Sequence, residues 1–331
     1  MSKVVRFHRT GGPEVLQLEE VTAREPQSGE VRIRTRALGL NRAEVMFRNG
    51  AYVVDPVFPS SLGYEASGEV ESVGPNVSGL TIGDAVSVVP SFAMTDYGVH
   101  GELVIAPATA VVKHPENLSW EEAAAVWMNF ITAYGALIDL AKVQPGDTVL
   151  IPAASSSVGL AAIQIARMAG AQPVALTRTS AKRQQLLDAG AAAVISTSEE
   201  DVVAQVRDLT DGQGAQVVFD PVAGPGFADL VAAAAPHAMI IVYGALAPDP
   251  TPLPVLGVLG KHLTIRGYEL FEITRDDNRR QDAIEFVLRG LTDGTLRPVI
   301  DTTFEFGDIV EAHRYLEAGN QVGKVVLTVP R

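Results

Sequence analysis

The sequence predicts an α/β protein of two domains, in which a doubly wound parallel sheet follows a β-rich region. Three observations predict this fold class. The chain has 331 residues, more than a single hydrophobic core usually organises. Short strand patterns separated by turn signals fill residues 1–120. From residue 148 onward, apolar strand patterns alternate with helical ones, as in parallel sheets covered by helices on both faces.

The first region is typical of a barrel or sandwich of short strands. Runs rich in Val and Ile are separated by turn signals such as Gly74-Pro75-Asn76 and Gly83-Asp84, and strands spaced in this way favour an antiparallel arrangement. One helix is expected at 41–48. The expected strands are 31–35, 66–73, 85–89 and 103–105.

A helical stretch opens after Ser119. This serine fits an N-cap, and Glu121 and Glu122 supply acidic first-turn residues that suit the helix dipole. The helix is expected to extend over 123–141. The strands expected after it are 148–153, 173–177, 193–196, 216–220 and 239–243, and the helices are 158–169, 182–189, 200–209 and 227–235.

The last part of the chain lacks this alternation. A polar helix is expected at 276–289, a strand at 301–306, a helix at 307–318 and a closing strand at 325–329. A piece of this size does not build a core of its own, so we expect it to pack against the amino-terminal β region. The predicted domains are therefore 1–122 together with 268–331, and 123–267.

Composition limits the classes of partner and site. Hydrophobic residues form 47% of the chain and charged residues 20%, which argues against bulk disorder. A formal net charge of −13 repels nucleic acid and anionic membrane. The absence of cysteine removes disulfides, thiol catalysis and cysteine-ligated zinc. The amino terminus starts directly in a strand pattern and shows no signal peptide, so a soluble, cytoplasmic protein is expected.

The turn after the strand at 148–153 has features of a dinucleotide site. Ala154, Ser156 and Gly159 occupy the G-x-G-x-x-G spacing, although only the third is glycine. Small residues there allow a tight turn, close approach to a pyrophosphate, and close packing of helix on strand. The hydroxyls of 155–157 can also bind phosphate at the helix start. The alternative is a serine N-cap on an ordinary helix; the βα units that follow favour the cofactor.

The next strand ends in a basic segment. An NAD site usually carries an acid there to accept the ribose hydroxyls, but the next acid along the chain is Asp188. Arg178 and Lys182 can instead bind a 2′-phosphate, so NADP is expected, and the alternative is a basic surface loop. Three hydroxyl residues accompany them: Thr177, Thr179 and Ser180.

At these residues the chain resembles the medium-chain dehydrogenase/reductase superfamily, and within it the zinc-free quinone oxidoreductase (zeta-crystallin-like) branch. The resemblance covers essentially the whole chain. It implies a GroES-like catalytic domain made from both chain ends, a Rossmann NADP-binding domain, and a homodimer or homotetramer. The motifs that carry it are 7–16, 39–44, GYEASG at 63–68, ITAYGAL at 131–137, 153–159 and GKVV at 323–326.

The zinc-dependent relatives have metal ligands that this chain lacks. They carry a Cys near Asn41 and a His in the segment that here reads Gly63-Tyr64-Glu65. A lone Glu65 cannot supply the three protein ligands of a catalytic zinc, so we expect no metal and a structural hydrogen bond from Glu65. The six His are scattered along the sequence, and His100 is expected at the surface.

The resemblance also implies site residues. It places Asn41 and Thr132 near the nicotinamide and Lys324 at the closure of the site. Plainer readings remain for Thr132 as a hydroxyl bonding its own helix, Tyr243 as core, and Lys324 as a surface charge. Adenine packing is expected to differ, because Thr197 stands where some relatives have a Tyr. The full expected cofactor set is Asn41, Thr132, Ala154, Ser155, Ser156, Ser157, Val158, Gly159, Thr177, Arg178, Thr179, Lys182, Tyr243, Gly244, Ala245, Leu270, Phe271 and Lys324.

The reaction implied is hydride transfer from NADPH to a quinone or an α,β-unsaturated carbonyl. Tyr52, Tyr64 and Asn41 are the catalytic candidates, and the plainer reading of each tyrosine is an aromatic wall of the pocket. Two alternatives stay open. The protein could bind NADPH without turnover, as a sensor or structural protein, or it could be a zinc-free NADP-linked dehydrogenase of another substrate.

Overall fold

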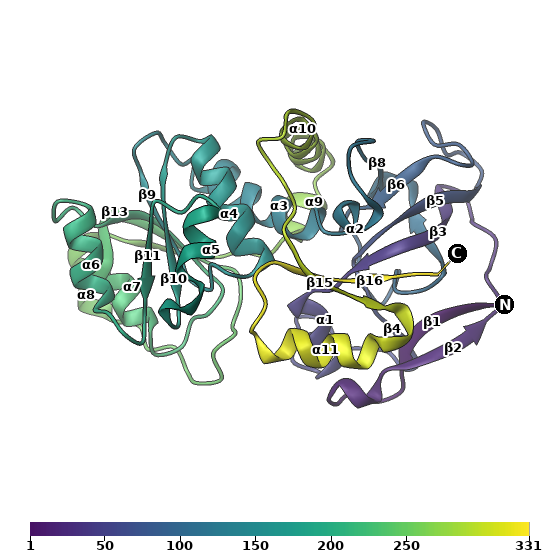
Figure 1. Ribbon diagram of the computed structural model, residues 1–331, viewed down its shortest axis with the longest axis horizontal. Helices are drawn as coiled ribbons and strands as arrows, with labels where there is room; N and C mark the ends of the chain where they lie inside the picture. The colour runs from purple at the N-terminus through teal and green to yellow at the C-terminus, as the bar shows by residue number, and fades with distance from the viewer. Residues whose placement is uncertain (331) are drawn as a thin grey trace. The chain divides into compact units, whose positions relative to one another are not determined.

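The computed structural model describes residues 1–330, which divide into two compact units. Unit 1 comprises residues 1–128, 274–277 and 298–330, and unit 2 comprises 129–273 and 278–297. Figure 1 shows the elements of each unit, coloured along the chain. Unit 1 is therefore built from both ends of the chain, as the sequence predicts.

Unit 2 contains a parallel sheet of six strands in the order β11-β10-β9-β12-β13-β14. Every neighbouring pair is parallel. Counted along the chain this order is 3-2-1-4-5-6, the doubly wound arrangement that binds dinucleotides where the order reverses, here between β9 and β12. The predicted doubly wound sheet is confirmed. The strands are β9 (Thr148–Ile151), β10 (Gln172–Thr177), β11 (Ala193–Ser196), β12 (Ala215–Asp220), β13 (Ala234–Val242) and β14 (Thr264–Gly267).

The helices of unit 2 match the predicted ones to within a few residues. Three further elements had not been expected as such: a 3-10 turn, η4 (Ser180–Lys182), and the helices α8 (Val255–Lys261) and α9 (Phe271–Thr274). The others are α4 (Ser157–Met168), α5 (Arg183–Asp188), α6 (Val202–Leu209), α7 (Phe227–Ala233) and α10 (Asp277–Asp293).

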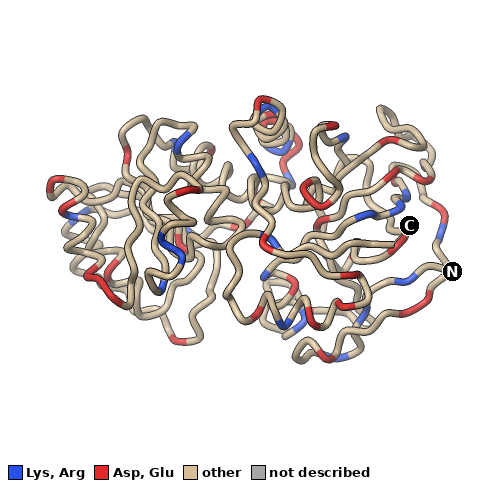
Figure 2. The backbone as a smooth tube through the Cα atoms, viewed as in Figure 1, with Lys and Arg blue, Asp and Glu red and all other residues tan. Residues whose placement is uncertain are grey.

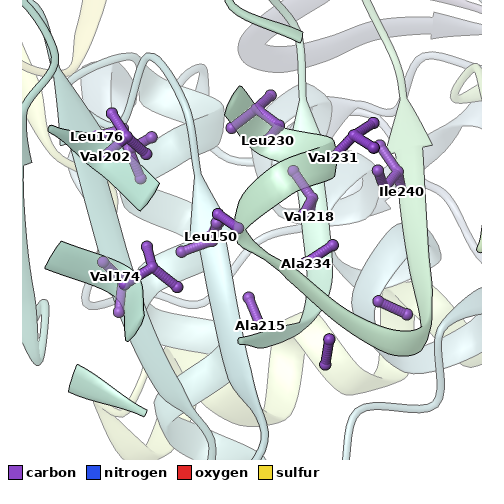
Figure 3. Close-up of a cluster of buried hydrophobic side chains, with 14 of the residues drawn as sticks. Leu150, Val174, Leu176, Val202, Ala215, Val218, Leu230, Val231, Ala234 and Ile240 are labelled. Carbon is purple, nitrogen blue, oxygen red and sulfur yellow. The ribbon is translucent and has the colours of Figure 1, made fainter. Parts of the chain in front are cut away.

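A buried apolar cluster joins the sheet of unit 2 to α6 and α7. Figure 3 shows side chains of the strands, such as Leu150 and Val218, meeting Leu230 and Val231 of α7 and Val202 of α6. Each fully buried side chain of this kind contributes about 1.5–3 kcal/mol. The strands read as continuous apolar runs because both faces of the sheet are covered.

The helix predicted at 123–141 is wrong as a single element. The chain forms α2 (Trp120–Ala123), a break, α3 (Trp127–Tyr134) and a π-helical stretch, η3 (Gly135–Leu140). The cap is as predicted: Ser119 Oγ accepts the Glu122 N–H at 3.2 Å, and the Glu122 carboxylate accepts the Ser119 N–H at 2.8 Å. The break places Ala124 and Ala125 in a buried cluster of unit 1, so tertiary packing overrides the helical pattern.

The same stretch meets the length and composition criteria of a membrane span. Residues Trp120–Leu140 have a mean hydropathy of 1.3, but 72% of the apolar window is buried inside the protein. A core helix passes the same test, so the stretch is weak evidence for a membrane segment.

Unit 1 is built on a sheet of seven strands, in which β7 pairs with β3 beside the path β15-β16-β3-β5-β6-β8. A smaller sheet has the order β2-β1-β4. The strands are β1 (Ser2–Phe7), β2 (Gln17–Val21), β3 (Glu30–Gly39), β4 (Ser60–Ser61), β5 (Glu65–Val73), β6 (Ala85–Val88), β7 (Leu103–Pro107), β8 (Val111–Lys113), β15 (Ile300–Glu305) and β16 (Lys324–Thr328), and the helices are α1 (Arg42–Arg48) and α11 (Ile309–Ala318), with short 3-10 turns at Pro13–Val15, Ala108–Ala110 and Phe306–Asp308.

The carboxyl-terminal strand β16 joins this sheet next to β3. The pairing is antiparallel and sets Val326 opposite Gly39, so the last segment packs on the amino-terminal region as predicted. The polar helix α10 does not follow it. Its Phe286 ring lies 4.9 Å from that of Tyr134, and Arg279 pairs with Asp139 at 2.5 Å, both within unit 2.

The two compact units differ in detail from the predicted domain bounds. Residues 123–128 fall in unit 1, and 268–273 with 278–297 fall in unit 2. The division 1–122 with 268–331, and 123–267, stays a prediction for the limits of independent folding domains.

Candidate functional site

The turn between β9 and α4 is held in the shape that its small residues predict. Ala153 has a positive φ of 49°, and the Ala154 N–H donates to Leu176 O of the neighbouring strand at 3.1 Å. Ser156 caps α4 by accepting the Gly159 N–H at 3.0 Å. A Cβ at Gly159 would lie 2.6 Å from Ala154 O. Glycine therefore allows the close packing of helix on strand that the fold requires.

The predicted phosphate loop and the predicted basic segment meet in space. The Lys182 Nζ donates to Ser155 Oγ at 3.2 Å, although 27 residues separate them. The side chains of the four residues 155–158 are half-buried, and Arg178 and Thr179 are exposed. A cation thus reaches the start of α4, where the helix dipole already favours an anion.

The loop after β11 lies beside the loop after β10. The N–H groups of Thr197 and Ser198 donate to Thr177 O at 2.8 Å and Arg178 O at 3.0 Å. Glu199 then accepts the Ser180 N–H with both carboxylate oxygens, each at 3.2 Å. Glu199 was not among the predicted site residues, because an acid was expected only directly after the second strand. The parallel pairing of β10 with β11 brings this residue of the third strand's loop beside the second strand's loop.

A second group of predicted residues follows β13, beside the end of β12, where Asp220 was not predicted. Tyr243 stacks on Phe219 with ring centroids 3.9 Å apart, and its hydroxyl is buried without a hydrogen-bond partner. Asp220 is fully buried and accepts the N–H groups of Val222 and Ala223, and burial raises its pKa. Gly244 is half-buried and Ala245 is exposed.

The segment after β14 packs on α3. The Tyr268 hydroxyl donates to Ile131 O at 3.5 Å, and a Cβ at Gly135 would lie 2.2 Å from that hydroxyl. The neighbouring predicted residues are largely buried within unit 2: Thr132, Leu270 and Phe271.

Asn41 and Lys324, both in unit 1, form a buried polar cluster with Glu44 and Glu65. The Asn41 Nδ2 donates to carboxylate oxygens of Glu44 and Glu65, at 3.1 Å each. The Lys324 Nζ donates to Asn41 Oδ1 at 2.6 Å and forms an ion pair with Glu65. Lys324 is 1% exposed, so its reading as a surface charge is wrong.

Glu65 makes the structural hydrogen bonds that the sequence predicts. Besides Asn41 and Lys324, its Oε1 accepts the Met128 N–H at 2.8 Å. Its companion Glu44 is completely buried, and that burial raises the pKa of Glu44 to about 7.

His100 is fully buried, so its predicted surface position is wrong. Its Nε2 lies 3.8 Å from Glu44 Oε1, and burial lowers the pKa of His100 to about 4. A Cβ at Gly63, where φ is 105°, would lie 2.2 Å from the imidazole ring. Only glycine leaves room for this histidine.

The two tyrosine candidates lie in different surroundings within unit 1. Tyr52 is half-buried, and its ring lies 6.4 Å from that of Phe47, edge to face. Tyr64 is 1% exposed and lies 6.3 Å from the ring of Phe92.

Two further features bear on the choice of site. A hollow of about 460 Å³ lies among residues 167–173 and 187–192, at the amino ends of β10 and β11 and so at the sheet edge opposite the loops described above. Within residues 1–330, no group of three or more His, Asp or Glu side chains could hold a metal ion.

The residues at the carboxyl ends of β9 and β10 fit a dinucleotide. Gly159 supplies a small residue, the start of α4 capped by Ser156 supplies N–H donors, and Lys182 at Ser155 supplies positive charge. All three lie at the same edge of the sheet. Parallel sheets bind ligands at this edge.

Two family sequence models match the chain. The model described as "Alcohol dehydrogenase GroES-like domain" matches residues 27–116, and the one described as "Zinc-binding dehydrogenase" matches residues 157–289. A quinone oxidoreductase of Pseudomonas aeruginosa is 32% identical over 335 aligned positions, which cover 99% of each chain.

Solved structures of proteins from the same family are also similar to this chain. The Escherichia coli quinone oxidoreductase complexed with NADPH superposes with a TM-score of 0.89 at 28% identity, covering 98% of this chain and 99% of that one. A protein described as an NAD-dependent alcohol dehydrogenase superposes with a TM-score of 0.90 at 32% identity, covering 99% and 100%. The chain therefore belongs to the medium-chain dehydrogenase/reductase superfamily, in its zinc-free quinone oxidoreductase branch.

Proposed function

We propose that this protein is an NADPH-dependent oxidoreductase that reduces a quinone or an α,β-unsaturated carbonyl by hydride transfer without zinc. The observation that carries the proposal is the contact between Ser155 and Lys182, which joins the diphosphate loop to the segment expected to bind a 2′-phosphate. The whole-length relatives that are quinone oxidoreductases support it.

NADPH supplies the hydride, and the chain supplies binding and position. In this proposal the turn 153–159 holds the diphosphate, and Arg178 with Lys182 holds the 2′-phosphate. The chain has a formal net charge of −13, which repels an anionic cofactor, so positive charge at the binding site is needed. Figure 2 shows acidic residues along the backbone of both units, so an anionic cofactor needs a basic segment that offsets the overall field.

The catalytic assignments are proposals of the same kind. Asn41 is fixed by Lys324 and two carboxylates, which suits a group that holds one orientation beside the nicotinamide. Tyr52 is the better-placed tyrosine for donating to a developing oxyanion, because it is partly exposed whereas Tyr64 is buried. A Tyr52→Phe variant that keeps full turnover would leave Tyr52 as a wall of the pocket.

Steady-state oxidation of NADPH with a panel of quinones and enones, in the presence of a chelator, tests the function. We expect consumption of NADPH with at least one acceptor and no loss of rate with the chelator. Tight NADPH binding without reduction of any acceptor would favour a sensor. NADP-linked alcohol oxidation would favour a dehydrogenase, the activity named for one similar structure.

We also propose that the protein forms a homo-oligomer through α8 and the edge strand β14. Within residues 1–330, β14 pairs only with β13 in the sheet, and an edge strand can pair with a second copy of itself. The helix that precedes it, α8, exposes large apolar side chains, with Leu256 85% and Leu259 63% exposed. Patches of this kind mark interaction surfaces.

Light scattering tests this interface. The wild-type chain is expected to elute with at least twice its own mass, and Leu256→Glu is expected to shift it to a monomer. Leu209→Glu, at another half-exposed leucine, is the matched control and should leave the mass unchanged. The cytoplasmic location stays a prediction, which cell fractionation with an antibody to the chain would test.

A further inference from the structure

The loops after β10 and β11 together form one surface at the ends of two neighbouring strands. Backbone hydrogen bonds from Thr197 and Ser198 join the second loop to the first at Thr177 and Arg178. Glu199 continues this contact, because both its carboxylate oxygens lie 3.2 Å from the Ser180 nitrogen. An acidic side chain therefore lies within the segment that carries the basic residues.

Of the charged residues around this surface, Arg183 and Glu200 form an ion pair with each other. Arg183 is engaged elsewhere: it pairs with Glu200 at 2.5 Å and donates to Val194 O. The other charged residues of the two loops are Arg178 and Lys182 after β10, and Glu199 and Asp201 after β11. The Glu199 carboxylate therefore adds a negative charge to the surface that the sequence suggests for a 2′-phosphate.

We propose that Glu199 is a specificity-determining residue that limits the preference of this site for NADPH over NADH. The inference rests on the proposed function and concerns the adenosine end of the same site. A carboxylate beside a phosphate dianion repels it, whereas a carboxylate can accept a ribose hydroxyl of NADH. Glu199 also occupies the Ser180 N–H, a donor that a 2′-phosphate would otherwise use.

The position of Glu199 explains how such a residue can act without being part of the β10 segment. Thr177 pairs with Ser196 at the end of the parallel β10–β11 ladder, so residues three positions further on each strand emerge side by side. Glu199, Ser180 and Arg178 are all exposed, which leaves the surface accessible to a cofactor.

Calorimetric binding of NADPH and NADH to the full-length protein tests the proposal. Glu199→Gln removes the charge and keeps an acceptor for the Ser180 N–H. We expect the dissociation constant for NADPH to fall about threefold to fivefold, as for loss of an exposed like-charge contact, and that for NADH to stay within about twofold. The 2′-phosphorylated fragment adenosine 2′,5′-bisphosphate should follow NADPH, and ADP should follow NADH.

Asp208→Asn is the matched control, because it removes one exposed charge from α6 of the same unit. It should leave both affinities unchanged. Glu199→Ala provides a second variant, and unchanged thermal unfolding of both variants would establish that they are folded.

The outcomes separate the inference from the proposed function. If the wild type binds NADPH and Glu199→Gln changes both cofactors equally or neither, the role of Glu199 is overturned and the function stands. If Asp208→Asn reproduces the shift, the effect is one of net charge and the inference is again overturned. If the wild type binds neither cofactor, both proposals fail.

Discussion

At the scale of single residues, Glu44 and His100 form a buried pair whose two titrations oppose each other. Burial raises the pKa of Glu44 from 4.5 to about 7, so the folded state holds a proton that the unfolded state releases. This stabilisation is present below pH 4.5 and is lost as the pH rises toward 7. Burial lowers the pKa of His100 from 6.5 to about 4. Its contribution is present above pH 6.5 and is lost as the pH falls toward 4.

A Glu44→Gln variant should reveal how His100 makes the free energy of unfolding depend on pH. Between pH 4.5 and 6.5 the slope from Glu44 opposes the slope from His100, and it also opposes those from His114 and His313, whose pKa values are likewise lowered by burial. The variant lacks the opposing slope of Glu44, so its free energy of unfolding relative to that of the wild type should rise by about 2 to 3 kcal/mol across that window. Urea denaturation followed by tryptophan fluorescence measures this, because Trp120 and Trp127 both lie in unit 1.

Glu116→Gln, at an exposed position of the same unit, should keep the pH profile of the wild type. A pH profile of Glu44→Gln that runs parallel to that of the wild type would contradict the raised pKa of Glu44.

At the scale of elements, the approach of α4 to β9 depends on Gly159. The Cβ of an alanine there would lie 2.6 Å from Ala154 O and 2.7 Å from the Ala154 Cα. These are backbone atoms that cannot rotate away, so the helix itself must move. The serine-capped start of α4 would shift with it, away from the position that the β9 end and Lys182 define.

Gly159→Ala is therefore expected to lower the free energy of unfolding by about 1 to 3 kcal/mol, as for overpacking, and to weaken NADPH binding about tenfold. Thermal unfolding and cofactor titration measure the two effects. Gly226→Ala is the control, since a Cβ at Gly226 meets no atom within 4 Å. Normal NADPH affinity in Gly159→Ala would show that the turn is not the diphosphate site.

At the scale of the whole molecule, Arg48 joins segments from both ends of the chain. Its guanidinium is fully buried and donates to Gly11 O at 2.9 Å, to His313 Nδ1 at 3.0 Å and to Glu317 at 2.8 Å. This one side chain therefore connects α1 to α11 and to the loop that follows β1, at Gly11. Since unit 1 is discontinuous, such contacts hold the carboxyl-terminal piece on the amino-terminal one.

Arg48→Met should destabilise unit 1 by about 3 to 5 kcal/mol, because it removes one partner of a buried charged network. Tryptophan fluorescence should report an earlier unfolding transition, whereas the fraction of the far-UV signal that belongs to unit 2 should be retained at that denaturant concentration. Arg314→Met, on the same helix α11 but with an exposed side chain, is the control. Equal midpoints for Arg48→Met and the wild type would contradict this role for Arg48.

How far the sequence predicts this protein differs between its parts. In unit 2 the apolar runs and turn residues predict five of the six strands and four helices, because those five strands are largely buried and each helix follows its strand directly. The edge strand β14 is largely exposed and was not predicted. The helix at 123–141 failed for a tertiary reason: Ala124 and Ala125 pack with Ala37 and Val326, and no local pattern records that contact. The predicted packing of α10 against unit 1 was wrong for the same reason, because its partners Tyr134 and Asp139 lie far away in the sequence.

By itself, the sequence determined the doubly wound sheet, the glycine at the third position of the dinucleotide turn, and the basic segment after the second strand. These features depend on periodicity and on residue size within a short stretch. The tertiary structure alone decided that Lys182 reaches Ser155, that Glu199 joins the basic segment, and that Lys324, Glu65, Glu44 and His100 are buried together. Burial and charge pairing depend on which strands become neighbours, and that is a property of the assembled sheets.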